Sequence, residues 1–328
     1  MLVLSRDEVR ELLELDALLD ALAQAMADLS AGRASMPERV AAFVEERGGL
    51  LGAMPGYVPA LDALMSKLVS MFPRNAGGPV PTHQALIAVF DPENGSPAAL
   101  LDGTEITAAR TGACSALSVR LLAREDASVV AVLGTGVQAR SHARAVVRVR
   151  AVSELLIAGR DRARAEALAS ELASELGVSV RAVASYQEAL ERADVVCATT
   201  HPVEPVVRRE WLSPGTHVTS VGYNPQGREL DDRTVVDALV CVESRSAALA
   251  PAPAGSADLT EPLDAGLITP DHVYAELGEL VSGTKPGRTS PEQITLYKSV
   301  GVAAQDAAAA ALVLARARET GAGREITL

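Results

Sequence analysis

The strongest constraint on the fold lies in the middle of the chain, where an apolar run leads directly into a glycine turn. The run is Val129–Leu133, and Gly134, Gly136 and Ala139 follow it in a G-x-G-x-x-A pattern. In such a turn the first glycine permits a tight reversal, the second lets a pyrophosphate approach the backbone, and the small third residue lets the next helix pack on the sheet. The pattern predicts a dinucleotide-binding unit that begins well inside the chain.

Strand and helix patterns alternate after this turn. Apolar runs predict strands at 155–158, 178–183, 194–200 and 217–222, and helical patterns predict helices at 138–147, 162–176 and 186–192. Strands that alternate with helices form a parallel sheet with right-handed crossovers, so we expect an α/β fold with a Rossmann-type doubly wound sheet. Ligands of such sheets bind at the carboxyl ends of the strands. A strand, turn and helix that bind nothing is the alternative.

The choice between NAD and NADP depends on the end of the second strand, where an acidic residue would accept hydrogen bonds from the adenosine ribose of NAD. This chain has Gly159, Arg160 and Asp161 there. The planar fork of Arg160 can pair with a 2′-phosphate, so NADP is the predicted cofactor and NAD stays open. Asp161 would take the ribose role if the strand ended one or two residues later. Arg160 and Arg162 would otherwise be surface charges at a helix start.

Composition excludes several classes of partner. The 328 residues are 48% hydrophobic and 22% charged, which is enough apolar material for two domains. The net charge of −12 is spread without a basic stripe, so we expect neither a nucleic-acid partner nor an anionic membrane surface. We also expect no targeting signal and no transmembrane segment.

The cysteines indicate the redox environment. Cys114, Cys197 and Cys241 lie among apolar or small residues, at spacings that match no metal site. We therefore expect reduced thiols in a cytoplasmic protein, with no disulfide and no metal centre.

The region before the glycine turn is long enough to form a separate substrate domain. Strand patterns occur at 48–57 and 64–70, and Asn94-Gly95 between two apolar runs predicts a hairpin. A helix is expected from Ile106 onward. Lys67 stands out because apolar residues surround it in the sequence, whereas an isolated lysine or arginine is more often a surface charge.

Several motifs outside the glycine turn occur together. They are Met36-Pro37-Glu38-Arg39, the Lys67 segment with Pro81-Thr82-His83, the run 102–111 that begins Asp-Gly-Thr, and Leu296-Tyr297-Lys298-Ser299-Val300-Gly301. In this order, over nearly the whole chain, they resemble the ornithine cyclodeaminase and mu-crystallin family. The resemblance implies a homodimer. It also implies a smaller α+β substrate-binding and dimerisation domain, at 1–122 plus 297–328, into which a Rossmann domain at 123–296 is inserted.

The same resemblance implies the roles of individual residues. Arg39, Lys67 and Arg110 would hold the carboxylate of a small amino or imino acid, since a carboxylate that leaves water needs cationic donors. Gly134, Gly136 and Arg160 are expected at the dinucleotide from the residues alone. To these the resemblance adds Thr82, Arg110, Thr111, Val137, Gln138, Thr200, Val221, Arg228 and Ser299. Ser299 as a simple helix cap is the alternative.

Two departures from the family pattern bear on the reaction. Ornithine cyclodeaminases have an aspartate in the loop after the Val-Gly of the last predicted strand, but this chain has Asn224. Asn224 can hydrogen-bond but cannot act as a carboxylate base. The acidic residue expected before Met54-Pro55 is also not evident, since Gly52 and Ala53 stand there. Both changes weaken the ornithine cyclodeaminase hypothesis.

The remaining motifs are closer to the mu-crystallin branch, which implies reduction of cyclic ketimines by NAD(P)H. We therefore expect hydride transfer to an imine carbon next to a carboxylate, or the reverse oxidation of an amino acid. The candidate catalytic residues are Arg39, Lys67, Arg110 and Asn224, and Lys67 could either hold the carboxylate or protonate the imine nitrogen. An ornithine cyclodeaminase and a non-catalytic NADP-dependent binding protein are the alternatives.

Overall fold

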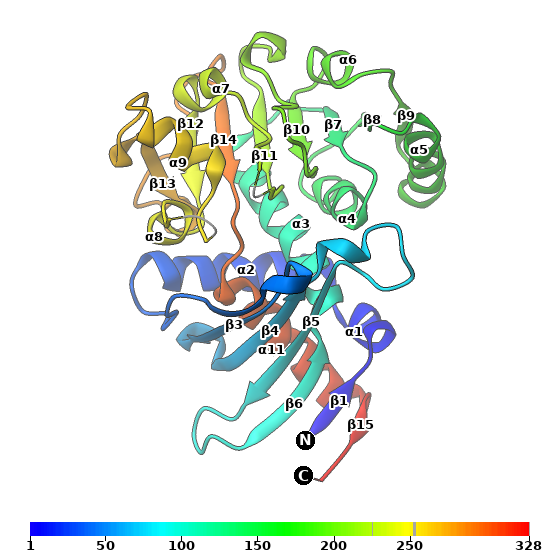
Figure 1. Ribbon diagram of the computed structural model, residues 1–328, viewed down its shortest axis with the longest axis vertical. Helices are drawn as coiled ribbons and strands as arrows, with labels where there is room; N and C mark the ends of the chain where they lie inside the picture. Colours follow the sequence, from blue (N-terminus) through cyan, green and yellow to red (C-terminus); the bar gives the residue numbers. More distant parts are fainter. Residues whose placement is uncertain (225, 252–253, 328) are drawn as a thin grey trace. The chain divides into compact units, whose positions relative to one another are not determined.

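The computed structural model describes residues 1–224, 226–251 and 254–327, which form two compact units (Figure 1). The first unit comprises Met1–Arg110 and Val302–Leu328, and the second comprises Thr111–Gly301. The boundaries expected from the sequence, at 122/123 and 296/297, differ from this division. The difference arises because helix α3 (Gly103–Leu122) runs through both units, and because 297–298 belong to a strand of the second unit.

The first unit is built on a seven-stranded sheet with the order β15-β1-β6-β5-β4-β3-β2. All neighbouring pairs are antiparallel except β1 with β6. Gly95, with a φ of +75°, lies in the predicted turn between β5 and β6. The strands are β1 (Leu2–Leu4), β2 (Val40–Val44), β3 (Gly49–Val58), β4 (Ala63–Met71), β5 (His83–Phe90), β6 (Pro97–Asp102) and β15 (Arg324–Glu325).

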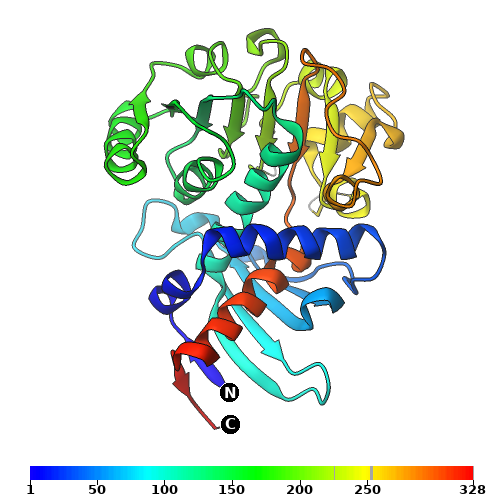
Figure 2. The same ribbon diagram turned by 180° about the vertical axis from the view of Figure 1, so that it is seen from behind.

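Helices cover one face of this sheet (Figure 2). They are α1 (Arg6–Leu12), α2 (Leu15–Ser30) and α11 (Ala303–Thr320), with 3₁₀ turns η1 (Glu45–Arg47), η2 (Pro59–Leu61) and η3 (Pro73–Asn75) in the loops. The alanines of α11 let it approach the sheet closely, because a Cβ at Gly56 would lie only 3.1 Å from that of Ala303. α11 is therefore a buried packing helix.

The opposite face of the same sheet carries exposed apolar residues. Val40, Ala53, Leu68 and Leu86 stand directly opposite one another on β2, β3, β4 and β5 and form an apolar row across these strands. Three of them are 41% to 64% exposed: Leu68, Leu86 and Val40. A large exposed apolar patch usually marks an interaction surface.

The second unit contains an eight-stranded parallel sheet with the order β13-β12-β14-β11-β10-β7-β8-β9. The strand order reverses between β7 and β10, which is the position where doubly wound sheets bind ligands. The strands are β7 (Val129–Leu133), β8 (Glu154–Ala158), β9 (Ser179–Ala182), β10 (Val195–Ala198), β11 (His217–Ser220), β12 (Leu239–Val242), β13 (Val273–Glu276) and β14 (Thr295–Lys298).

Both faces of the parallel sheet are buried. Val130 and Val132 of β7 belong to one core cluster, and Ala131 and Leu133 belong to the other. This explains the continuous apolar strand sequences, which parallel sheets require. The helices of this unit are α4 (Val137–Val146), α5 (Arg162–Leu176), α6 (Tyr186–Leu190), α7 (Asp232–Asp237), α8 (Arg245–Ala248), α9 (Ala257–Asp264) and α10 (Leu277–Val281), with η4 (Arg209–Trp211) and η5 (Pro270–His272).

The fold class expected from the sequence is confirmed, and the first five strands of the parallel sheet lie where the apolar runs predicted them. Strands β12, β13 and β14 were not predicted. β14 comes last in the chain but lies between β11 and β12, so its neighbours are far away in the sequence. Local periodicity carries no information about such a pairing.

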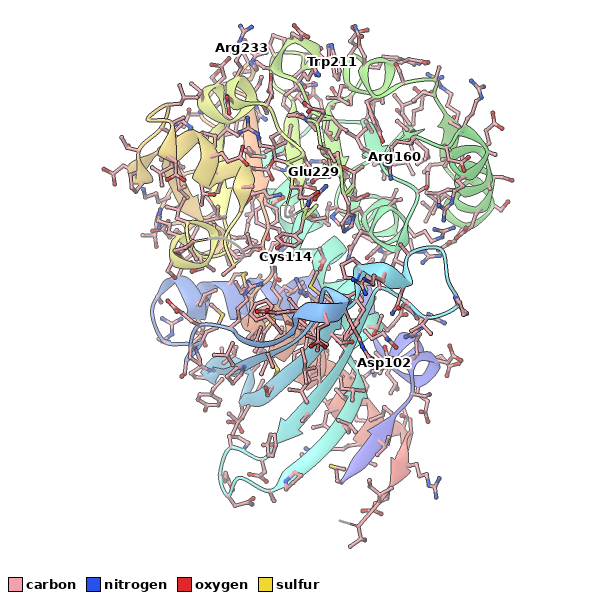
Figure 3. All side chains as sticks on the ribbon, viewed as in Figure 1. Asp102, Cys114, Arg160, Trp211, Glu229 and Arg233 are labelled. Carbon is pink, nitrogen blue, oxygen red and sulfur yellow. The ribbon has the colours of Figure 1, made fainter. Side chains whose placement is uncertain are left out.

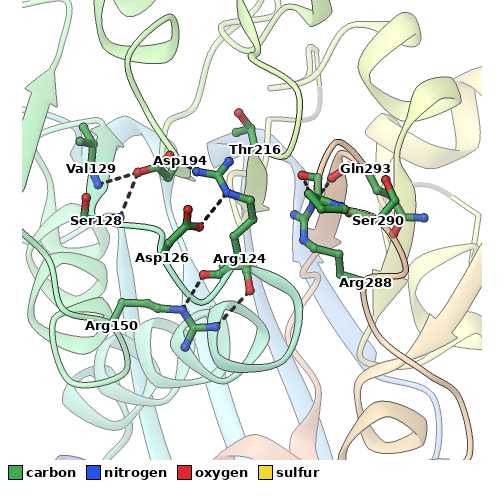
Figure 4. A network of polar contacts seen from close by, with 12 residues as sticks. Arg124, Asp126, Ser128, Val129, Arg150, Asp194, Thr216, Arg288, Ser290 and Gln293 are labelled. Carbon is green, nitrogen blue, oxygen red and sulfur yellow. Dashed lines mark hydrogen bonds and ion pairs between the residues drawn. The ribbon is translucent and has the colours of Figure 1, made fainter.

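Arginines and a carboxylate join α3 to the amino ends of the strands (Figure 4). Arg150 donates to the carbonyl oxygens of Val119 at 2.9 Å and Ala123 at 3.1 Å, which closes the carboxyl end of α3. Asp194 accepts from the backbone N–H groups of Ser128 and Val129 at 2.9 and 3.0 Å. These contacts satisfy backbone groups that a helix end and strand starts leave unpaired.

Candidate functional site

The first unit contains a buried cluster of charged side chains. Lys67 lies in the middle of β4, Arg110 on α3, and Asp306 in the first turn of α11. The Lys67 ammonium lies 2.7 Å from Oδ2 of Asp306, and Nε of Arg110 donates to Oδ1 of Asp306 at 3.0 Å. Gln305 accepts a further hydrogen bond from Arg110. All three charged residues are at most 5% exposed.

Burial and neighbouring charges shift the protonation equilibria of this cluster. The pKa of Lys67 is lowered to about 8, first by desolvation and then by the charges of Arg110 and Arg39, while Asp306 acts in the opposite direction. Burial acts to raise the pKa of Asp306, but the charges of Arg110 and Lys67 outweigh it, and this pKa is lowered. Lys67 is therefore close to the proton-transfer range of neutral solution.

Two other residues belong to the surroundings of Lys67. Arg39 precedes β2 and acts electrostatically on Lys67, so all three cations singled out in the sequence belong to one region of the first unit. His83 begins β5, and its pKa is lowered to about 4 by burial and by the charges of Lys67 and Arg110. The His83 imidazole is thus neutral at neutral pH and is a poor general acid there.

Asp306 was not recognised as a site residue in the sequence, where it only interrupts an alanine-rich run. A signal was nevertheless present, because Asp306 stands among alanines, and a carboxylate that such a helix buries needs cationic partners. Which cations would pair with it was not visible, since Arg110 is 196 residues away along the chain and Lys67 is still further away.

In the second unit, the glycine turn has the geometry that dinucleotide binding needs. Gly134 has a φ of +120°, and a Cβ there would lie 2.7 Å from Oγ1 of Thr199, so only glycine fits. Gly136 caps α4 and has no atom within 4 Å of its virtual Cβ position. Its backbone is thus open to the approach of a pyrophosphate, and the first turn of α4 offers N–H groups to it.

Gln138 supports this assignment. Its side-chain oxygen Oε1 is buried and accepts no hydrogen bond from a described residue. A buried acceptor without a donor is costly, and a ribose hydroxyl is one group that would satisfy it. Val137, the first residue of α4, is exposed beside it. The residues present therefore fit a bound dinucleotide.

The end of β8 has a physical reason to lack an acidic residue. A Cβ at Gly159 would lie 2.8 Å from Cγ2 of Thr135, so a larger side chain would displace the glycine turn. β8 ends at Ala158, and the Asp161 carboxylate caps α5 by accepting from the N–H of Arg164 at 3.1 Å. Arg160 is exposed and forms no ion pair with a described residue.

The other predicted cofactor residues of the second unit follow the carboxyl ends of neighbouring strands. Thr200 follows β10, Val221 follows β11, and Ser299 follows β14. The Ser299 hydroxyl donates to buried Glu243, and Val302 caps α11 instead, so the alternative role of Ser299 as a helix cap is wrong. Arg228 pairs with Asp232 at 2.6 Å and with Glu261 at 3.3 Å.

The other three predicted site residues, Asn224, Thr82 and Thr111, have structural positions of their own. The Asn224 carboxamide donates to the carbonyl of Pro202 at 2.8 Å and accepts from the N–H of Gln226 at 3.0 Å, so it structures its own loop. Thr82 belongs to the first unit, where its carbonyl accepts from the N–H of Phe72 at 2.8 Å. Thr111 is buried in α3 and begins the second unit.

Among the described residues, no three His, Cys, Asp or Glu side chains are grouped as metal ligands. No helix in the described part of the chain has the length and apolar character to cross a membrane. Cys114, Cys197 and Cys241 are buried free thiols.

The fold and these sites define a class: an α/β protein with a dinucleotide-type glycine turn at the switch point of its parallel sheet and a separate buried cationic cluster. Comparison with known proteins narrows this class. Residues 1–321 match the model of the ornithine cyclodeaminase/mu-crystallin family. The chain belongs to this family.

Individual relatives are similar over nearly their whole length. The chain is 39% identical to ketimine reductase mu-crystallin of Rattus norvegicus over 315 residues, which covers 94% of this chain and 95% of the rat protein. The structure of Delta(1)-pyrroline-2-carboxylate reductase from Thermococcus litoralis, in complex with NADH and L-proline, has a TM-score of 0.95 and 37% identity, with 99% and 100% of the two chains covered. An archaeal alanine dehydrogenase dimer with bound NAD has a TM-score of 0.92 and 32% identity, covering 100% and 99%.

Proposed function

We propose that this protein is an NAD(P)H-dependent oxidoreductase that reduces an imine carboxylate, in particular a cyclic ketimine carboxylate, to the amino acid, or runs the reverse oxidation. The observation that carries this proposal is the buried cluster of Lys67, Arg110 and Asp306 in a chain that also contains a dinucleotide-type turn. Relatives named as ketimine and pyrroline-2-carboxylate reductases match it over nearly its full length.

The cationic cluster is suited to a small acid. Asp306 neutralises one positive charge, so Lys67 and Arg110 together keep a positive excess that favours a carboxylate. Arg110 uses Nε and one terminal amine for Asp306 and Gln305, and its second terminal amine has no hydrogen-bond partner among the described residues. We propose that this amine and Arg39 hold the substrate carboxylate and orient the imine.

We assign the proton transfer to Lys67. A bound reduced nicotinamide supplies the hydride for the imine carbon. The imine nitrogen must then gain a proton, and a Lys67 ammonium with a pKa of about 8 can donate one and be reprotonated from solvent near neutral pH. Asp306 holds the ammonium at 2.7 Å and stabilises its charged form.

We propose that residues at the glycine turn and at three strand ends of the second unit hold the dinucleotide. They are Gly134, Gly136, Val137, Gln138, Thr200, Val221 and Ser299. Arg160 makes NADP the preferred form, because the exposed guanidinium is not engaged with a carboxylate and Asp161 serves α5 as a cap. Thr82, Thr111 and Arg228 remain candidate cofactor contacts.

An ornithine cyclodeaminase is the second candidate, and the structure gives it less support. That reaction would need a carboxylate in place of Asn224, whose carboxamide is occupied within its loop. A non-catalytic binding protein is also less favoured, since a carrier of an apolar ligand has no need of the buried cations Lys67 and Arg110.

We also propose that the protein is a homodimer. The apolar row Val40, Ala53, Leu68 and Leu86 gives the open sheet face the character of an interface, and the archaeal alanine dehydrogenase relative is described as a dimer. The buried free thiols suit a reducing compartment, so the cytoplasm is the proposed location.

The test of the proposed function is a panel of imine substrates. Oxidation of NADPH and of NADH is followed with Δ1-pyrroline-2-carboxylate, Δ1-piperideine-2-carboxylate, and pyruvate plus ammonia or methylamine. We expect turnover of at least one imine carboxylate, with the product amino acid identified by mass. Arg110→Met should abolish this turnover. Wild-type protein that binds dinucleotide but reduces none of these imines contradicts the proposal, and release of ammonia from ornithine without net NADH change supports the cyclodeaminase instead.

A further inference from the structure

A second buried ionic network lies in the dinucleotide-binding unit, at the carboxyl ends of β10, β11 and β14. It consists of Glu229, Lys298 and Asp258, none of which is more than 3% exposed. Figure 3 labels Glu229 within this unit. The proposed reaction uses none of these side chains directly, and burial of three charges at this depth costs free energy that only close pairing and hydrogen bonds offset.

The Glu229 carboxylate gathers four hydrogen bonds from the ends of two neighbouring strands. Oε1 accepts from the N–H and the hydroxyl of Thr200, both at 2.6 Å. Oε2 accepts from the hydroxyl of Ser220 at 2.7 Å and from the N–H of Gly222 at 2.8 Å. Its acceptor capacity is therefore filled by donors from the segments that follow β10 and β11.

Lys298 completes the network from β14. Its ammonium donates to the Ser220 hydroxyl at 2.9 Å and to the carbonyl of Gly222 at 3.0 Å, and it lies 2.8 Å from Oδ2 of Asp258. Because Lys298 donates to the Ser220 oxygen, that hydroxyl must direct its own proton at Glu229. The backbone N–H of Gly222 thus donates to Glu229, and the backbone carbonyl of Gly222 accepts from Lys298.

Gly222 itself shows how closely these parts approach one another. A Cβ at this position would lie 2.2 Å from the carbonyl oxygen of Thr200 and 2.4 Å from Cδ of Glu229. Any side chain would force the two strand ends apart. The network therefore closes the base of the loop that begins at Gly222 and returns at Glu229.

The sheet topology assigns this network to one half of the dinucleotide. In a doubly wound sheet the cofactor crosses the switch point, and each half of the sheet serves one mononucleotide. The glycine turn and Arg160 follow β7 and β8, on the adenosine side. Thr200 and Gly222 follow β10 and β11, on the other side of the switch point, where the nicotinamide mononucleotide belongs.

We propose that Glu229 is a positioning residue for the nicotinamide half of the cofactor, and that it acts by fixing Thr200 and Gly222 in the conformation that receives this half. The inference rests on the proposed dinucleotide function. Lys298 assists by holding Ser220 and the Gly222 carbonyl.

Glu229→Gln is the informative substitution, because it keeps the size of the side chain but replaces one acceptor oxygen with an N–H₂ donor. That amide would face either Thr200 or Gly222, whose N–H groups are also donors. The strand end that faces the amide loses its hydrogen bonds and moves. The adenosine half of the site contains none of these groups, so it should be unaffected.

The experiment compares full cofactor with fragments of it by calorimetry, with no substrate present. Glu229→Gln should weaken binding of NADPH or NADH by about tenfold or more, because buried donors lose their acceptor. It should leave the affinities for 2′,5′-ADP and AMP within about twofold, since these fragments occupy only the adenosine half. Wild-type protein that binds no dinucleotide contradicts the proposed function, whereas wild-type binding that Glu229→Gln does not change contradicts only the role of Glu229.

Asp194→Asn is the matched control. Asp194 also collects two backbone N–H groups, but at the amino ends of β7 and β10, away from the ligand edge. The Asp194→Asn substitution should reduce thermal stability without changing the ratio between the affinity for the full cofactor and the affinity for the fragments. If Asp194→Asn and Glu229→Gln weaken cofactor and fragments alike, Glu229 is only structural and the proposal is wrong.

Ser220→Ala keeps the proposal testable if Glu229→Gln does not fold. It removes one hydroxyl that links Lys298 to Glu229 and retains every charge. Loss of one hydrogen bond should weaken the full cofactor several-fold and leave fragment affinity unchanged. Unchanged binding of the full cofactor would overturn the positioning role of the network.

Discussion

Lys67 shows how position in the fold alters the chemistry of a single residue. A lysine on a solvated surface is fully charged at neutral pH, but in β4 desolvation lowers its pKa to about 8. Asp306 opposes this shift and keeps the ammonium from losing its proton altogether. The two residues together give a group that can both carry and release a proton near neutrality.

The first prediction concerns the pH dependence of imine reduction. Lys67 donates a proton only below its pKa, so kcat/KM should be high below about pH 8 and fall above it. Lys67→Met should lower kcat by at least about a hundredfold and remove this pH dependence. The measurement is kcat/KM from pH 6 to pH 10 at saturating cofactor.

The Asp306→Asn variant shows whether the fall in kcat/KM comes from titration of Lys67 or from titration of the substrate. Because the Asp306 charge raises the pKa of Lys67, its removal should move the fall in kcat/KM to lower pH. A profile that stays where it was in Asp306→Asn would show that the imine of the substrate titrates and that Lys67 does not.

The second prediction concerns Arg160 and the choice of cofactor. Arg160→Ala should weaken NADPH by about tenfold or more and leave NADH nearly unchanged, since only NADPH carries the phosphate that the guanidinium would bind. Binding constants of both cofactors test this. Arg162→Ala is the matched control, because Arg162 is engaged with Glu166 at 2.8 Å. Equal losses for both cofactors in Arg160→Ala would contradict a 2′-phosphate contact.

At the scale of elements, the strand, turn and helix at 129–146 contain two glycines that one motif requires for different reasons. Gly134 is required by the protein itself, since its φ of +120° and its contact with Thr199 exclude a side chain. Gly136 is not, because no atom lies within 4 Å of its Cβ position. The lack of a side chain at Gly136 is therefore explained by a ligand that approaches the backbone there.

The third prediction follows from this difference. Gly136→Ala should leave the thermal midpoint within a few degrees of wild type but weaken dinucleotide binding by about tenfold, because the new methyl group occupies the approach of the pyrophosphate. Gly134→Ala should instead destabilise the fold strongly. Unfolding scans and cofactor titrations of the two variants separate these effects. Undiminished cofactor affinity in Gly136→Ala would contradict a pyrophosphate at this turn.

The element α11 shows where sequence patterns were sufficient and where they were not. Its alanine-rich sequence is typical of a buried packing helix, since small side chains permit close approach to a sheet. The role of Asp306 at its start depends on partners from β4 and α3, which the helix sequence does not specify. A pattern within one element predicts its burial but not its partners.

At the scale of the whole molecule, each unit has a sheet with its own pattern of exposure. The parallel sheet is buried on both faces, whereas the described helices of the first unit, α1, α2 and α11, cover one face of the antiparallel sheet. The uncovered row of Val40, Ala53, Leu68 and Leu86 is the feature that a second copy of the chain would cover.

The fourth prediction concerns this face. Leu68→Glu should shift the protein from dimer to monomer, because a charge buried in an apolar interface is unfavourable and a symmetric dimer contains it twice. Sedimentation of wild type and variant at several concentrations measures the change. Leu267→Glu is the control, since Leu267 is also an exposed leucine but lies in the second unit. A wild-type monomer, or an equal effect of both substitutions, would contradict the proposed interface.

The sequence by itself determined the parallel α/β class, the glycine turn and the first five strands of the parallel sheet. These features are local, because apolar periodicity, glycine requirements and helix caps act within a few residues. Only the tertiary structure decided that β14 lies between β11 and β12, that Lys67 and Arg110 share Asp306, and that Glu229 and Lys298 bind Thr200 and Gly222. The physical reason is that a buried charge needs a partner but does not specify where in the chain that partner lies, so only packing selects it.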